Sequence, residues 1–401
     1  MLDLDNGLKV RDNFFNLSVN NIILNKEIKK EAEKENISQN DIYFREWYLF
    51  ENSYDESKTA IDLYLEKDLS EDEKFFVENF KNYVLSIFKV KKDNGEEYVL
   101  LNLINNQKYC VKKDSTDQNI DIGEYVLARL IPFDTNTYFF TNTLCKINID
   151  SNDQIYSILA QFELDYPHSA FTDNKNKIES SYKIQELEYQ DFVEFFGSDE
   201  IIVSGDEITE KLHEFYHYRY FQKKDKNTGK TIAKIFREKY GSHPSIPSID
   251  LPINLMELEE VGIVYDVIEG LNFLPWYGVF KEIFRNENFK EIPGYKKCVN
   301  EYLKSDTISS LPFKKVMREF PENTVKVIKD ILDRKRFNIP EDFNKLMIKY
   351  KQKTITRSLE PTLIPMPERT KALLRAKKTE EFSGLHFYEV SKKYRNLHKY
   401  C

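Results

Sequence analysis

The sequence predicts an α+β fold that is mainly helical, with a small antiparallel, barrel-like β module in the N-terminal half. Three observations lead to this prediction. Apolar residues recur at helical spacing near both ends of the chain. Residues 83–150 contain four or five short strand-like runs separated by turn residues. Prolines and glycines divide the stretch after residue 250 into segments of ordinary helix length.

The chain has 401 residues, enough for more than one hydrophobic core. We expect a helical region (1–82), the β module (83–150), a mixed α/β region (151–250), a helical bundle (251–352) and a basic tail (353–401). In the first region, Ser70 precedes Glu73 by three residues, which is the capping-box spacing of a helix start. In the second, Asp93-Asn94-Gly95 predicts a turn between two strands. Asp206 is expected to cap a helix in the third.

Charge is unevenly distributed along the chain. The formal net charge is −8, which gives no general attraction to nucleic acid or to anionic lipid. Residues 349–401, however, carry thirteen Lys and Arg against five Asp and Glu. We expect this tail to contact an acidic surface on another protein or on its own acidic body. The residues expected to bind the partner are Lys392, Lys393, Tyr394 and Arg395.

The sequence also predicts a compartment. The N-terminal residues are acidic and lack an apolar core of signal-peptide length. No uncharged apolar run approaches the roughly 18 residues that a membrane span requires. The four cysteines are too far apart for a zinc knuckle. We therefore expect a cytoplasmic protein without a membrane partner.

Two distant segments resemble one another, which suggests an internal repeat. The second copy needs a four-residue insertion to align throughout. The matched residues are, in order, Glu46 and Glu214, Trp47 and Phe215, Tyr48 and Tyr216, Lys58 and Lys230, Thr59 and Thr231, and Glu66 and Glu238.

The second copy contains His213-Glu214-Phe215-Tyr216-His217, the His-Glu-x-x-His spacing of zinc hydrolases. On a helix, His213 and His217 would face one zinc ion, Glu214 would act as the general base, and Glu238 would be the third ligand, with His243 as an alternative. The first copy has Arg45 and Leu49 in place of the two histidines. The repeat therefore favours a structural role for this helix.

Residues 44–140 resemble uncharacterised bacterial proteins of the SEC-C domain-containing type. The shared pattern comprises Glu46-Trp47-Tyr48-Leu49-Phe50, then Leu69-Ser70-Glu71-Asp72-Glu73, then Gly123-Glu124-Tyr125-Val126-Leu127-Ala128-Arg129-Leu130. The tail echoes the SEC-C core at Ser391-Lys392-Lys393-Tyr394, but it lacks the glycine and the cysteine spacing of that zinc knuckle. The resemblance implies a bacterial protein and no particular activity.

The favoured hypothesis is a non-enzymatic interaction or regulatory protein. One alternative is a zinc-dependent hydrolase that uses Glu214 with His213, His217 and Glu238. The other is a nucleic-acid-binding protein that uses the β module and the basic tail.

Overall fold

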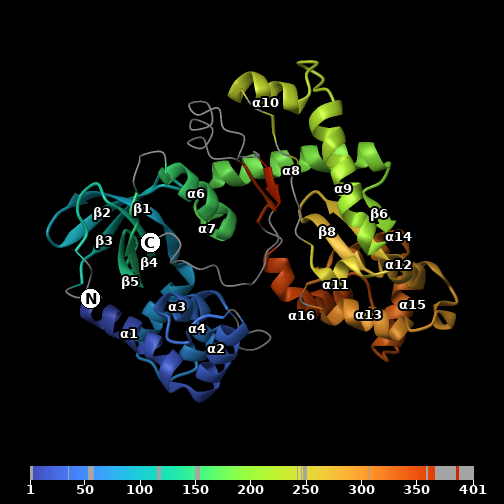
Figure 1. The fold of residues 1–401 in the computed structure, drawn as a ribbon. Coiled ribbons are helices and arrows are strands. Elements are labelled where there is room, and N and C mark those ends of the chain that lie inside the picture. Colours follow the sequence, from blue (N-terminus) through green and yellow to red (C-terminus); the bar gives the residue numbers. More distant parts are fainter. Residues whose placement is uncertain are drawn as a thin grey trace. The chain divides into compact units, whose positions relative to one another are not determined.

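The structure is a computed structural model that describes residues 3–34, 36–52, 58–114, 119–149, 154–241, 243–244, 246, 251–305, 307–357, 360–365 and 385–387. The chain forms two compact units that divide between Asn174 and Lys175. Unit 1 contains the β module, and unit 2 contains a second, three-stranded sheet (Figure 1). The mixed α+β class is confirmed.

Unit 1 is built around five strands, each of which pairs with two neighbours, so that the order β1-β2-β3-β5-β4 closes on itself. The strands are β1 (Val84–Asp93), β2 (Glu97–Asn102), β3 (Lys108–Lys112), β4 (Tyr125–Pro132) and β5 (Thr137–Lys146). The module was expected to be antiparallel, and this is wrong for one pair, because β3 and β5 run parallel. A ring with an odd number of strands cannot alternate in direction all the way round.

Helices pack against this module. Apolar side chains of α1 to α5 form one core with Ile131, Phe133 and Phe139 of the β module. Side chains of α6 and α7 form another with residues of β1, β4 and β5. Ser70 and Glu73 form the predicted capping box at the start of α5. The helices of unit 1 are α1 (Leu4–Asn20), α2 (Ile22–Lys34), α3 (Ile42–Glu51), α4 (Ala60–Leu65), α5 (Glu71–Asn79), α6 (Gln154–Asp165) and α7 (Pro167–Phe171), with a 3-10 turn η1 (Phe80–Asn82).

A buried ion pair joins α3 to the β module. Arg129 of β4 is fully buried, and its Nε lies 3.1 Å from Oε1 of Glu46, which is 1% exposed. Arg129 Nη2 also donates to Glu51 Oε1 at 2.7 Å. The hydroxyl of Thr141 donates to Glu46 at 2.6 Å, and Thr143 donates to the same oxygen. Burial raises the pKa of Glu46, and the Arg129 charge opposes that rise.

Unit 2 contains a three-stranded antiparallel sheet in the order β6-β7-β8, formed by β6 (Glu200–Val203), β7 (Val261–Asp266) and β8 (Gly270–Pro275). β6 lies in the region 151–250, which was expected to be mixed α/β. The uniformly helical bundle expected over residues 251–352 is wrong at its start, where β7 and β8 lie. A short apolar run such as 261–265 suits a buried strand as well as a helix, and periodicity alone does not separate the two.

The sheet of unit 2 has an apolar core on each face. On one face, Val261, Ile263 and Tyr265 pack with α8 and α9. On the other, Val264 and Leu274 pack with a helical bundle. The helices are α8 (Lys175–Phe196), α9 (Ile208–His217), α10 (Ile232–Tyr240), α11 (Ile253–Met256), α12 (Tyr277–Arg285), α13 (Tyr295–Lys304), α14 (Leu311–Glu319), α15 (Pro321–Ile331) and α16 (Glu341–Arg357). Shorter elements are the 3-10 helices η2 (Gly205–Glu207) and η4 (Phe289–Glu291), the π-helix η3 (Tyr218–Gln222), and the strands β9 (Leu363–Pro365) and β10 (Leu385–Phe387).

The helix expected to start at Asp206 starts differently. Ser204 and Glu207 form a capping box around η2, and α9 follows from Ile208. The serine and the glutamate stand three residues apart, so each side chain can reach the backbone N–H of the other. Asp206 lies inside the turn and is exposed.

Replacing Arg129 tests the buried pair of unit 1. Arg129→Met is expected to lower the free energy of unfolding by about 3–5 kcal/mol, because it leaves the Glu46 carboxylate buried without its cation. The double variant Arg129→Met, Glu46→Leu should recover most of that loss. Chemical denaturation followed by Trp47 fluorescence, in a Trp276→Phe background, reports on unit 1.

The matched control is the half-exposed pair of Lys58 and Glu66. Lys58→Met should cost no more than about 1 kcal/mol, as for other exposed pairs. Equal losses for Arg129→Met and for the double variant would contradict the account.

Candidate functional site

The histidines of the His-Glu-x-x-His segment lie on the solvent side of α9. Leu212, Phe215 and Tyr216 are buried, whereas His213, Glu214 and His217 are exposed. The imidazole centroids of His213 and His217 lie 6.4 Å apart with their planes 25° from parallel. The spacing therefore places both rings on one helix face, as predicted, but that face is the outer one.

The remaining residues expected at a zinc site are engaged elsewhere. The carboxylate of Glu214 accepts from Lys211 Nζ at 3.0 Å. Glu238 lies on α10 and accepts from Lys230 Nζ at 2.6 Å. Among the residues that the structure describes, no group of three or more His, Cys, Asp or Glu side chains is arranged to hold a metal ion.

The buried side of α9 contributes to a polar network in the core of unit 2. The fully buried Glu188 of α8 accepts from the hydroxyls of Tyr216 at 3.0 Å and Tyr265 at 3.2 Å. Arg219 Nη1 lies 2.9 Å from Glu188, and Arg219 Nε donates to Asp191 at 2.7 Å. This network joins α8 to α9, η3 and β7, so the aromatic residues of the segment have a structural role.

The two predicted repeat copies share local features. Thr59 accepts from the backbone at the start of α4, and Thr231 does so at the start of α10. Lys58 pairs with Glu66, and Lys230 pairs with Glu238, across eight residues in each case. Glu46 and Glu214 differ, however, since the first is buried and the second is exposed. A common origin for the copies stays a prediction.

The residues expected to bind a partner through the basic tail are Lys392, Lys393, Tyr394 and Arg395. They lie outside the described residues.

Sequence reasoning missed a pocket of about 480 Å³ in unit 2, at the end of β8. Its walls are largely apolar. One side comes from the end of β8 and the start of α12, and the other from α13 and the segments just before and after it. Its lining includes Pro275, Trp276, Val279, Pro293, Cys298 and Tyr302. Lys297 and Glu301 also line it, and both are well exposed.

The pocket exists because α12 is capped by a residue from another element. Helix starts leave backbone N–H groups without partners, and the N-cap side chain usually accepts from one of them. Here the N-cap residue is Trp276, which cannot accept. Instead, Glu260 Oε1 accepts from the N–H of Gly278 at 2.6 Å and of Val279 at 3.1 Å. Glu260, just before β7, therefore leaves the Trp276 side chain available to line the pocket.

Two glycines permit this arrangement. A Cβ on Gly278 would lie 2.7 Å from Oε2 of Glu260, so any larger residue would push the carboxylate away. A Cβ on Gly262 would lie 2.5 Å from Cβ of Tyr277, so only glycine lets the first residue of α12 press against β7. The start of α12 is thus fitted closely to the strand that precedes it.

Trp276 adopts an unusual backbone conformation. Its φ of 56° lies in the left-handed region, where a side chain costs roughly 1–2 kcal/mol. The residue is 39% exposed, although it borders an apolar pocket. Strained residues of this kind persist where the surroundings hold them and cluster at binding sites.

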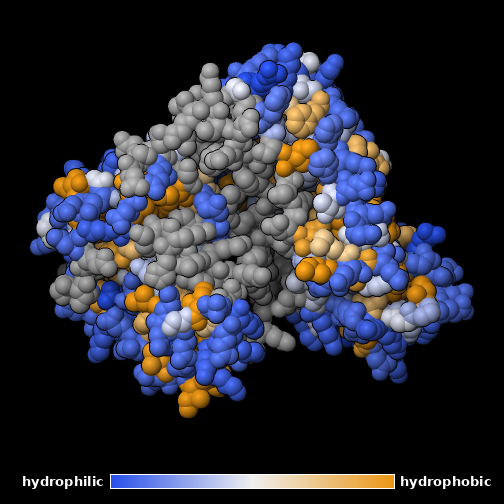
Figure 2. Space-filling model, in the orientation of Figure 1, coloured by the Kyte–Doolittle hydropathy of each residue, from blue (hydrophilic) through white to orange (hydrophobic). Residues whose placement is uncertain are grey.

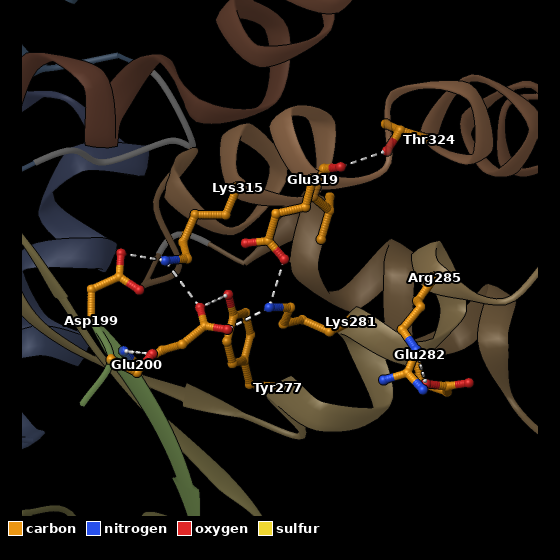
Figure 3. A network of polar contacts seen from close by, with 11 residues as sticks. Asp199, Glu200, Tyr277, Lys281, Glu282, Arg285, Lys315, Glu319 and Thr324 are labelled. Carbon is orange, nitrogen blue, oxygen red and sulfur yellow. Dashed lines mark hydrogen bonds and ion pairs between the residues drawn. The ribbon is translucent and has the colours of Figure 1, made fainter. Parts of the chain in front are cut away.

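A network of charged groups fixes the other side of α12 (Figure 3). Glu200 of β6 accepts from the Tyr277 hydroxyl at 2.9 Å and pairs with Lys281. Lys315 of α14 contacts Glu200 at 3.0 Å and Asp199 at 2.7 Å. Glu319 lies 2.8 Å from Lys281. The network ties α12 and α14 to the edge of the sheet.

Each lysine of this network pairs with two carboxylates. Burial alone would raise the pKa of Glu200, but hydrogen bonds from Lys281 and Lys315 hold that pKa below its usual value. Burial alone would lower the pKa of Lys315, but hydrogen bonds to Asp199 and Glu200 hold it above its usual value. Neither group is poised for proton transfer near neutral pH.

Cys298 is the thiol in the pocket wall, and it is half-buried. Burial raises the pKa of Cys298 to about 12, and Glu301 and Glu260 add to the rise. A thiol with this pKa is protonated at neutral pH, whereas a nucleophile or a metal ligand must be a thiolate. Cys298 therefore contributes an apolar surface.

Alkylation of Cys298 is expected to be slow at pH 8. With a pKa of about 12, roughly one thiol in ten thousand is ionised at that pH. Iodoacetamide should therefore modify Cys298 about a thousandfold more slowly in the folded protein than in urea, as followed by peptide mass spectrometry. The rate should rise about tenfold for each unit of pH between 9 and 11. Fast alkylation at pH 8 would indicate an ionised thiol and contradict the account.

Comparison with known proteins reveals one similarity. The sequence model of a family of unknown function (DUF7986) matches residues 19–161. These residues include the stretch 44–140 described above, whereas the pocket of unit 2 lies outside them. No curated protein and no solved structure matches the chain. Within the described residues, no helix is both long enough and apolar enough to cross a lipid bilayer.

Proposed function

We propose that this protein is a non-enzymatic interaction protein, and that the pocket beside Trp276 receives an apolar side chain of a partner protein. The observation that carries the proposal is the partly exposed Trp276 at the rim of an apolar recess. Its backbone is held in a left-handed conformation. Tryptophan is among the residues that most often dominate the binding energy of protein interfaces.

The helix ends near the pocket support an apolar occupant. A free helix N-terminus attracts anions, but Glu260 already accepts from the first N–H groups of α12. The second helix end near the pocket is the C-terminal end of α13. There, Lys351 of α16 donates to the carbonyl oxygens of Tyr302 and Ser305. These backbone groups are therefore satisfied within the chain. We therefore expect burial of apolar surface to be the main source of affinity within the pocket.

The zinc-hydrolase alternative is less well supported. Its four residues, His213, Glu214, His217 and Glu238, lie on exposed helix faces, and both carboxylates pair with lysines. A catalytic zinc ion needs three protein ligands and an open position for water. Within the described ranges, no group of side chains provides them.

The nucleic-acid alternative is also less well supported. Five-stranded Greek-key barrels that bind oligonucleotides use the face of their second and third strands. On this module, Lys113 pairs with Asp93 at 2.5 Å, and Lys112 pairs with Glu97 at 3.7 Å. These lysines are already neutralised, so they would contribute little to the release of counterions that drives phosphate binding.

The basic tail of residues 353–401 adds a second element to the proposal. Its excess of Lys and Arg complements an acidic surface, with Lys392, Lys393, Tyr394 and Arg395 as the contact residues. Such contacts accelerate association and select partners more than they add to affinity. We therefore assign the main binding energy to the pocket.

Selection of peptides tests the proposal. Purified full-length protein is used to select from a random peptide library displayed on phage, and the selected peptides are then measured by fluorescence anisotropy. Trp276→Gly should weaken their binding by about thirtyfold or more, as expected for loss of a hot-spot residue. Glycine accepts the left-handed conformation, so this variant should be at least as stable as the parent chain.

Ile268→Ala is the matched control, because Ile268 is 55% exposed and lies in the turn between β7 and β8, at the opposite end of β8 from the pocket. It should leave peptide affinity unchanged. The proposal fails if selection yields no peptide that depends on Trp276, or if a folded Trp276→Gly variant binds the peptides as tightly as the parent.

A further inference from the structure

In the part of the chain that the structure describes, one edge of the sheet in unit 2 carries no further strand, and this edge lies beside the pocket. Among the described residues, β8 pairs with β7 alone. Its two ends are covered, since Thr362 packs against Gly270 and the Tyr302 hydroxyl donates to the carbonyl oxygen of Pro275 at 2.6 Å. Between these ends, Leu271, Asn272 and Phe273 are partly exposed. On the face shown in Figure 2, apolar side chains gather over the region of β8 and α11.

The register of β7 and β8 identifies the backbone groups on this edge. In an antiparallel pair, opposite residues alternate between bonded pairs and pairs whose N–H and C=O groups point outward. The N–H of Trp276 donates to the carbonyl of Glu260 at 3.0 Å, which makes this a bonded position. Counting back along the register, Phe273 and Leu271 then occupy outward positions. Their N–H and C=O groups face the open edge.

The pocket lies on the same side of β8. Pro275 is also at an outward position, opposite Val261, so its carbonyl oxygen points toward the open edge. That oxygen accepts from Tyr302, which is itself part of the pocket wall. A chain paired with Leu271 and Phe273 would therefore run toward the pocket at the end of β8.

The composition of β8 is unusual for an edge strand. Natural edges are commonly protected by charged side chains, and β8, with the sequence Gly-Leu-Asn-Phe-Leu-Pro, has none. An uncharged edge with outward backbone groups suits an additional strand.

We infer that the partner supplies an extended segment that adds to β8 as a fourth strand and places one apolar side chain in the pocket. This inference rests on the proposed function. Main-chain hydrogen bonds to Leu271 and Phe273 would provide affinity for any extended segment, and the pocket would select the side chain. Because β8 carries no charged side chain and the pocket wall is largely apolar, the occupant that fits is an uncharged, extended stretch of the partner protein of the proposed function.

An N-methyl scan of the selected peptides tests strand addition without altering the protein. In an added strand, only alternate amides of the peptide donate to β8. Methylation of those amides should weaken binding about tenfold at each position, because one hydrogen bond is lost, and methylation of the amides between them should be tolerated. Binding is measured by fluorescence anisotropy against the full chain.

Amide hydrogen exchange of the full chain supplies a second readout. The amides of Leu271 and Phe273 should exchange at least tenfold more slowly with peptide bound. Asn272 is the internal control, because its amide lies at a bonded position opposite Val264. A methyl scan without alternation, with unchanged exchange at Leu271 and Phe273, would overturn strand addition.

The outcomes separate the two proposals. Peptides that depend on Trp276 but show no alternation would leave the pocket proposal intact and overturn strand addition alone. Peptides whose affinity alternates in the N-methyl scan but does not depend on Trp276 would overturn the pocket proposal. They would also overturn the placement of a partner side chain in the pocket. Sedimentation of the full chain adds one more arm. A dimer that the peptides dissociate would show that the edge pairs with a second copy, and would overturn the assignment to a different protein.

Discussion

The start of α12 is capped by Glu260, a residue from before β7, and the rest of the pocket depends on this interaction. A helix whose own N-cap residue accepts from the first turn needs a short polar side chain at that position. The borrowed carboxylate removes this requirement and permits a tryptophan. It also places a negative charge at the positive end of the helix dipole, which satisfies the helix start without a polar side chain from Trp276. Gly262 and Gly278 provide the space for the two elements to approach.

Elsewhere in the described residues, two clusters of buried charged groups are committed to structure. Glu46 and Arg129 join a helix to the β module in unit 1, and Glu188 and Arg219 join helices to the sheet in unit 2. Each pair includes hydrogen bonds from hydroxyls, which compensate part of the cost of burying charge. Within the described part of the chain, the pocket wall is instead largely apolar, with a protonated thiol, prolines and aromatic rings, and the charged residues Lys297 and Glu301 that also line it are well exposed. This contrast is the basis for proposing binding rather than catalysis.

Sequence reasoning succeeded where the signal is local. The strands of the β module follow from short strand-like runs separated by turn residues such as Asp93-Asn94-Gly95, and the capping box at Ser70 and Glu73 follows from a three-residue spacing. The His-Glu-x-x-His spacing placed both histidines on one face of a helix. It could not tell that this face is exposed, because that depends on packing against Phe192 and Tyr265 from distant segments. The pocket was missed for the same reason. Glu260 and Trp276 are sixteen residues apart, and β7 and β8, which bring them together, were mistaken for helix.

The most direct test of the account concerns the amides at the start of α12. Glu260→Ala removes the carboxylate that accepts from Gly278 and Val279, so hydrogen exchange at these two amides should accelerate roughly tenfold, as expected for loss of a helix cap. Glu259→Ala, at the exposed neighbouring position, should leave their exchange unchanged. Unaltered exchange at Gly278 and Val279 in the Glu260→Ala variant would contradict the claim that Glu260 holds this helix and the pocket beside it.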